Sequence, residues 1–135
     1  MIIKQVIVIR KDLNMRKGKM IAQGAHASMK VFFDRLIPLD NGANFSKKDN
    51  CYSISFTSEM KQWIQGDFRK IVVYVNSEQE LLEIYRQAVD ANLPCALIQD
   101  NGLTEFQGVK TYTAVAIGPA SGTEIDKITK DLPLL

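Results

Sequence analysis

The chain is predicted to form one α/β domain over residues 1–135, and the order of its segments is the main reason. Short runs of β-branched residues alternate with longer segments in which apolar residues recur at helical spacing. The connections are mostly short, and the length is sufficient for one hydrophobic core. Because helices that connect successive strands favour parallel pairing, this order predicts a largely parallel sheet covered on both faces.

Four strands are expected where β-branched residues are concentrated, at residues 2–10, 70–75, 95–99 and 111–117. About a dozen residues without a helical pattern join the last two strands. The final strand should therefore run antiparallel to the others. Residues 51–57 alternate in polarity, which indicates a further short and exposed strand.

Four helices are expected, at about residues 18–36, 58–66, 78–91 and 123–130. Pro38 should end the first helix, and Asn76 or Ser77 should cap the third. Gly24 lies within the first helix and costs about 1 kcal/mol relative to alanine. The large and small apolar residues of that helix are expected to face the core: Ile21, Ala22, Ala25, Met29, Phe32, Phe33 and Leu36.

The first helix also carries a polar stripe that begins in a basic turn. Its members are Lys19, Gln23, His26 and Lys30. Their offsets of zero, four, seven and eleven place them on one helix face. The stripe begins at a helix N-terminus directly after a strand, where α/β proteins often bind anionic ligands.

Composition limits the classes of partner. The net charge is only +2, so contact with a nucleic acid must come from a local basic patch, for which residues 16–19 are the candidate. Cys51 and Cys95 form no metal-binding motif with the single histidine, so no metal is expected. The two cysteines favour a reducing, cytoplasmic setting, and no membrane span or secretory leader is expected.

Polar residues follow or begin several of the expected strands. In an α/β sheet, sites form beyond the carboxyl ends of parallel strands. Lys19, Asp100, Thr104 and Thr113 are expected to converge there. Each also has a structural interpretation, because a lysine can be solvated, an aspartate can cap a turn and threonines are common in strands. A histidine in the position of His26 is more often a hydrogen-bonded structural residue than a catalyst. The motifs of phosphate-binding loops, dinucleotide sites and serine hydrolases are absent.

A set of motifs in a fixed order resembles a known family. The segment VIVIRKDLNMRKGKMIAQGAHA resembles the opening of the archaeal and eukaryotic, or type-two, peptidyl-tRNA hydrolases. Trp63 and Gly66 precede the strand KIVVYV in the same way, and the later segments LIQDNGLTE, TYTAVAIGP and IDKITKDLPLL match in order.

This resemblance implies a three-layer α/β/α sandwich on a four-stranded mixed sheet whose last strand is antiparallel. It implies hydrolysis of the ester that joins a peptide to the 3′ end of tRNA, without a cofactor, by a homodimer. The family's proposed catalytic residues correspond to Lys19, Asp100, Thr104 and Thr113. The further residues expected to bind the substrate are Arg16, Lys17, Gln23, His26 and Lys30.

Some positions depart from the family pattern. Asn101 replaces its usual alanine, and Leu103 stands where a polar or basic residue is common. About 20 residues, at about 38–58, have no counterpart in compact members of the family. This insert could cover the site, alter the dimer or bind another partner. Two alternative functions therefore stay open: an inactive module that binds tRNA or protein, and an ester or amide hydrolase with a small substrate.

Overall fold

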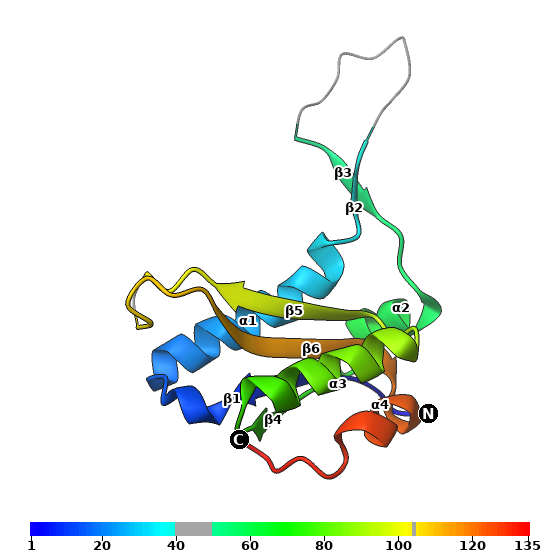
Figure 1. The fold of residues 1–135 in the computed structure, drawn as a ribbon. Coiled ribbons are helices and arrows are strands. Elements are labelled where there is room, and N and C mark those ends of the chain that lie inside the picture. Colours follow the sequence, from blue (N-terminus) through cyan, green and yellow to red (C-terminus); the bar gives the residue numbers. More distant parts are fainter. Residues whose placement is uncertain (40–49, 104) are drawn as a thin grey trace.

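A computed structural model describes residues 1–39, 50–103 and 105–135, and it shows a sheet between two layers of helices (Figure 1). The strands are β1 (Ile3–Arg10), β2 (Leu36–Pro38), β3 (Tyr52–Ile54), β4 (Lys70–Val75), β5 (Cys95–Asp100) and β6 (Thr111–Ser121). The helices are the 3₁₀ turn η1 (Lys11–Leu13), α1 (Lys17–Phe33), α2 (Ser58–Gln65), α3 (Glu78–Asp90) and α4 (Gly122–Thr129).

The main sheet is mixed and has the order β4-β1-β6-β5. Strand β1 pairs in parallel with β4, whereas β6 pairs antiparallel with both β1 and β5. The predicted mixed sheet with an antiparallel last strand is therefore confirmed. The expectation of a largely parallel sheet is correct only in that β1, β4 and β5 run in the same direction. Strand β6 lies between β1 and β5, so these two strands do not pair.

The two faces of this sheet carry separate apolar clusters. Helices α1 and α2 cover one face, where the buried residues include Ile9, Val31 and Met60. Helices α3 and α4 cover the other face, where Leu81 and Ile125 are fully buried. Ser77 caps α3 by accepting a hydrogen bond from the Glu80 N–H, as predicted. Both helical layers thus pack on the same central strands, β1 and β6.

The orientation of α1 differs from the expected one. Gln23 is 1% exposed and faces the sheet, whereas Ile21 is 73% exposed. The buried residues of α1 are Gln23, Gly24, Ala27 and Val31, and most are small. Small side chains allow the helix to approach the sheet closely, and Gln23 has hydrogen-bond partners that make its burial affordable. The large apolar side chains, including Met29 and Phe33, consequently remain on the surface.

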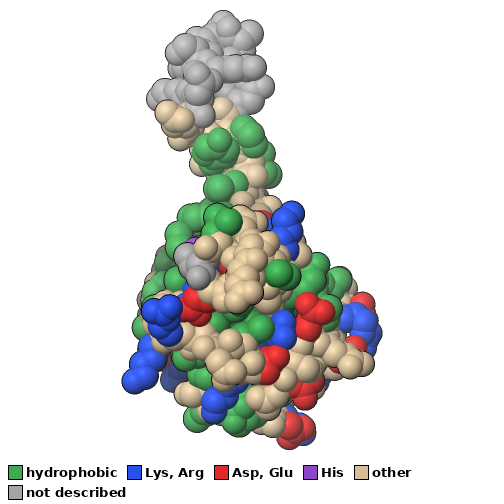
Figure 2. Space-filling view, turned by 60° about the vertical axis from the view of Figure 1, so that its left-hand side comes forward, with side chains coloured by type: hydrophobic (Ala, Val, Ile, Leu, Met, Phe, Trp, Pro, Cys, Tyr) green, Lys and Arg blue, Asp and Glu red, His purple; other side chains and the backbone are tan. Residues whose placement is uncertain are grey.

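The end of α1 also differs from the prediction. The helix ends at Phe33, and Leu36–Pro38 pairs as β2 with β3, residues Tyr52–Ile54. This two-stranded arm rises from the C-terminal end of α1 and carries exposed hydrophobic side chains (Figures 1 and 2). Local periodicity could not reveal β2, because its pairing partner lies well over ten residues further along the chain. Residues 40–49 of the expected insert lie outside the described part of the chain.

A β-bulge interrupts the pairing of β5 with β6. Ile98 lies opposite Ala114, but the next residue, Gln99, lies opposite Tyr112. Thr113 is thus an extra residue in β6, and such a residue changes the direction in which the side chain points. Strand β6 also continues to Ser121, past the predicted end at Ile117.

Replacement of Gly24 by alanine is expected to stabilise the fold. A Cβ atom at this position would lie 3.7 Å from Ile7 Cγ2, which is an ordinary van der Waals contact. Alanine is favoured over glycine within a helix by about 1 kcal/mol. Chemical denaturation should therefore show a higher free energy of unfolding for Gly24→Ala and a lower one for the bulky control Gly24→Leu. A destabilised Gly24→Ala variant would contradict this description of the packing.

Candidate active site

The candidate site lies where the N-terminal end of α1 meets the C-terminal end of β5. Lys19 Nζ lies 2.8 Å from Asp100 Oδ2 and donates a hydrogen bond to it. The two side chains are 15% and 14% exposed, so the ion pair is partly shielded from water but reachable from the surface. The pair joins segments that are 81 residues apart in the sequence.

Asp100 accepts hydrogen bonds from two further donors. The Gly102 N–H donates to Oδ1 at 2.7 Å, and Gln23 Nε2 donates to Oδ2 at 2.9 Å. The hydrogen bond from Lys19 is the main cause that lowers the pKa of Asp100 below its usual value, and the bonds from Gly102 and Gln23 act in the same direction. Burial opposes this shift without reversing it. Asp100 is therefore an ionised carboxylate at neutral pH.

Gln23 connects Asp100 to Thr113. The Thr113 hydroxyl donates to Gln23 Oε1 at 2.5 Å, and Thr113 itself is fully buried. Because this bond fixes the carbonyl end of the Gln23 amide, the amide nitrogen is directed at Asp100. The bulge in β6 makes the arrangement possible, since Thr113 and its neighbour Ala114 both lie on the side of the sheet that faces α1.

The loop after β5 was recognised from the sequence only as rich in turn formers. Gly102 adopts a φ of 77°, and its carbonyl accepts a hydrogen bond from the Gly108 N–H at 2.7 Å. A Cβ atom on Gly102 would lie 2.2 Å from the Val109 carbonyl oxygen, so only glycine fits. The signal in the sequence was the Asn101-Gly102 dipeptide, which marks a tight turn. The loop also brings the ring of Phe106 within 5.6 Å of Lys19 Nζ.

The expected substrate-binding residues are distributed around α1. Arg16 is exposed next to the site and lies 3.2 Å from Glu105. Lys17 is also exposed but lines an apolar groove on the other side of the helix. His26 is exposed further along α1, and Lys30 forms a surface ion pair with Asp34 at 2.7 Å. Of the predicted polar stripe, only Lys19 and Gln23 reach Asp100 among the described contacts.

Thr104, the remaining predicted catalytic residue, lies outside the described residues. Figure 2 shows the end of the molecule at which the 101–110 loop lies, with Lys or Arg and acidic side chains close together on its surface. Within the described ranges, no group of three His, Cys, Asp or Glu side chains is arranged to hold a metal ion.

The geometry offers an ammonium group, an ionised carboxylate and a loop N–H within one partly shielded polar cluster. A carboxylate can orient a water molecule, and an ammonium group can stabilise the negative charge that develops on a carbonyl oxygen. Those are two of the requirements of ester hydrolysis by water. The catalytic roles of these residues stay predictions.

Comparison with known proteins gives a consistent result. The family model described as "Peptidyl-tRNA hydrolase PTH2" matches residues 3–135. A protein of Methanocaldococcus jannaschii named peptidyl-tRNA hydrolase is 43% identical over 98% of this chain and 99% of its own length. Proteins with the same name from Methanococcus maripaludis and Sulfurisphaera tokodaii are each 42% identical, over 98% of both chains. The chain therefore belongs to the PTH2 family of peptidyl-tRNA hydrolases.

Proposed function

We propose that this chain hydrolyses the ester bond between the peptide and the tRNA in peptidyl-tRNA and thereby releases free tRNA. The observation that carries the proposal is the match to the family over residues 3–135, together with relatives of that name along the whole chain. The candidate site agrees with this chemistry, because its ammonium and carboxylate groups lie 2.8 Å apart at the surface.

Asp100 orients the attacking water in this proposal. A lowered pKa makes a carboxylate a weak proton acceptor at neutral pH, although it still accepts hydrogen bonds strongly. Water adds to the ester carbonyl carbon, and the bond from that carbon to the ribose oxygen of the tRNA then breaks. The proton that the attacking water gives up passes to the released ribose oxygen, which leaves as a hydroxyl group. The water-orienting role therefore fits Asp100 better than that of a strong base.

Lys19 stabilises either the oxyanion that forms on the ester carbonyl oxygen or the negative charge of the adjacent terminal phosphate. Thr104 holds the water or the ester through its hydroxyl, as expected from the family resemblance. Thr113 and Gln23 act one step further from the substrate. Because both are buried and hydrogen-bonded in a chain that ends on Asp100, their role is to hold its carboxylate in place.

Binding of the tRNA is assigned to basic side chains of α1 and of the turn before it. Arg16 lies beside the site with its side chain exposed to solvent. A tRNA phosphate could therefore replace Glu105 as its partner. Lys30 and His26 extend this surface along α1, whereas Lys17 lies on the other side of the helix, beside the apolar groove. The tRNA backbone would thus follow the outer side of the helix that carries Lys19.

The proposed assembly is a homodimer. An apolar groove of about 670 Å³ lies between α1 and the edge strand β4 and is supported by the C-terminal residue Leu135. Ile21, Met29 and Val72 line it and are exposed. An exposed apolar surface of this size indicates an interaction site. In a two-fold dimer, the same patch of each copy contacts the other copy.

The proposal also includes the cellular setting and the domain organisation. No helix in the described parts of the chain has both the length and the apolar character that crossing a membrane requires. Peptidyl-tRNA arises in translation, and both cysteines are free, which together support a cytoplasmic location. Residues 1–135 act as one domain, because β1 and β6, from opposite ends of the chain, share the same core.

Lys19→Ala and Asp100→Ala are expected to lower turnover of an N-blocked aminoacyl-tRNA about a hundredfold or more. Each removes a charged group placed beside the reacting ester, and such groups contribute effects of this size. The measurement is the initial rate of ester cleavage, with circular dichroism to confirm folding. Lys127→Ala, which removes another ion-paired lysine on the opposite face, is the control. Near-normal rates in both site variants would refute the assignment of the site.

The titration of Asp100 provides a test that does not depend on activity. Because Lys19 lowers the folded-state pKa, the pair stabilises the fold above the ordinary aspartate pKa, and this contribution is lost as the pH falls through the folded value. Carboxyl ¹³C NMR should show that the pKa of Asp100 lies below the ordinary aspartate value of 3.8. In Lys19→Met the midpoint should rise. An unchanged midpoint would show that the ion pair does not form in solution.

Ile21→Glu is expected to convert a dimer into a monomer. A buried, unpaired carboxylate in an apolar interface costs several kcal/mol per copy. Light scattering during gel filtration gives the mass directly. Val89→Glu, an equally drastic change at an exposed apolar residue of α3, serves as the matched control and should stay dimeric. A monomeric wild-type protein, or a dimeric Ile21→Glu variant, would refute this interface.

A further inference from the structure

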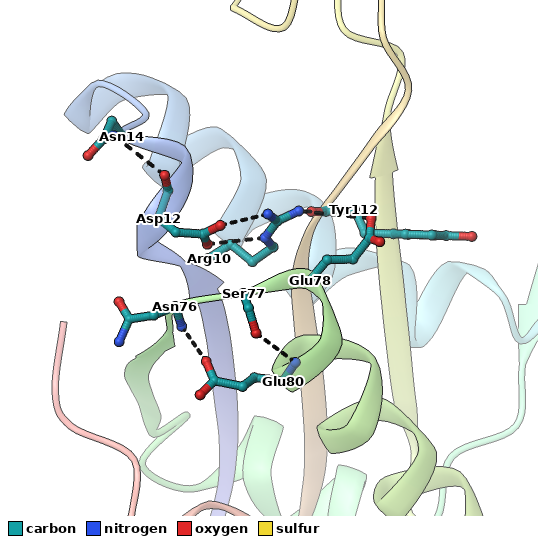
Figure 3. A network of polar contacts seen from close by, with 8 residues as sticks. All are labelled: Arg10, Asp12, Asn14, Asn76, Ser77, Glu78, Glu80 and Tyr112. Carbon is teal, nitrogen blue, oxygen red and sulfur yellow. Dashed lines mark hydrogen bonds and ion pairs between the residues drawn. The ribbon is translucent and has the colours of Figure 1, made fainter.

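Arg10, the last residue of β1, is an almost fully buried charge near the candidate site. Its side chain is only 10% exposed. Figure 3 shows its guanidinium group between the η1 turn, the start of β6 and the N-terminal end of α3. Removing a charge from water is costly unless it is paired and hydrogen-bonded, so the position requires specific partners. None of the steps proposed above uses this group.

The partners of Arg10 lie on separate segments. Its Nε and Nη2 atoms donate to the two carboxylate oxygens of Asp12, at 3.2 and 2.7 Å, in a forked arrangement. Its Nη1 atom donates to the backbone carbonyl of Tyr112 at 3.1 Å and lies 4.0 Å from a carboxylate oxygen of Glu78. One guanidinium group therefore joins η1 to β6 at the end of β1.

The contact with Tyr112 lies beside the bulge. The ladder between β1 and β6 ends with the pair Ile9 and Ala114. Beyond that pair, the side chain of Arg10 provides the link between the two strands. Tyr112 immediately precedes Thr113, the extra residue of the bulge. The position of this carbonyl therefore affects where Thr113 points, and Thr113 fixes the Gln23 amide that holds Asp100.

The contact with Asp12 lies at the entrance to α1. Asp12 belongs to η1, and Asn14 closes this turn in the left-handed conformation, with its N–H bonded to the Lys11 carbonyl. The chain then enters α1 at Lys17, two residues before Lys19. Among the described residues, no side chain caps the N-terminus of α1. The fork from Arg10 thus fixes the turn that delivers Lys19 to the site.

We propose that Arg10 is a positioning residue for the hydrolysis, a role that rests on the proposed function. By joining Asp12 to the Tyr112 carbonyl, it fixes the position of the start of α1 relative to the bulge of β6. The first of these carries Lys19 and Gln23, which contact Asp100, and the second carries Thr113, which holds the Gln23 amide. The buried guanidinium itself does not contact the substrate.

The test compares Arg10→Met and Arg10→Lys with the wild-type protein in steady-state cleavage of an N-blocked aminoacyl-tRNA. Methionine keeps much of the stem but donates no hydrogen bond, and lysine keeps the charge but cannot form the fork. A misplacement of about 1 Å can lower the rate on the order of a hundredfold. In Arg10→Met, kcat should fall by that order while KM changes by less than about twofold. Arg10→Lys should be intermediate.

Two controls separate positioning from a loss of folding. Arg86→Met removes an ion-paired but exposed arginine of α3 and should keep wild-type kcat. Rates are expressed per folded molecule, with the folded fraction measured by circular dichroism. If Arg10→Met does not fold, Asp12→Asn replaces it, because it breaks the fork from the other side and should show the same fall in kcat at constant KM.

A double-mutant cycle with Thr113→Val tests the route of the effect. Because Arg10 acts partly through the bulge, the combined fall in kcat in the double variant should be smaller than the product of the two single effects. Effects that multiply, a rise in KM alone, or wild-type kcat in folded Arg10→Met would each overturn the proposal. Failure of the proposed function is distinguishable, because the wild-type protein and Arg86→Met would then not cleave the substrate either.

Discussion

The carboxylate of Asp100 is the group on which the arrangement of the site depends. A carboxylate that is largely removed from water must be satisfied by hydrogen-bond donors. Its donors come from α1 and from the loop after β5, so the helix and the loop must both fit against the end of one strand. The ion pair with Lys19 is therefore a geometric constraint on the fold as well as a source of charge.

This constraint determines how α1 is rotated. Gln23 must face the sheet in order to reach both Asp100 and Thr113. A helix presents only one face to a sheet, so burial of this polar residue directs Ile21 and Met29 outward, into the groove beside β4. The chemistry of the proposed site and the apolar surface proposed for dimerisation thus have a common physical origin. A helix rotated to bury its large apolar residues would remove both.

The end of the main sheet beside the site is held in place largely by side-chain contacts. The β-bulge in β6 turns Thr113 toward α1, and Arg10 links strands β1 and β6 beyond the last pair of their ladder. Side-chain contacts of this kind hold the irregular end of the sheet in place. A regular ladder of backbone hydrogen bonds would not direct the same side chains toward α1. The arm formed by β2 and β3 rises from the opposite end of α1 and does not take part in these described contacts (Figure 1).

The sequence by itself determined the α/β class, the four strands of the main sheet, the antiparallel direction of the last strand and the residues to search for in the site. Strong β-branched runs and the Ser77 cap are local signals, so they could be recognised without tertiary contacts. Only the tertiary structure decided the strand order, the rotation of α1, the bulge at Thr113 and the pairing of Leu36–Pro38 with Tyr52–Ile54. Each of these depends on partners far apart in the chain, and periodicity along one segment carries no information about them.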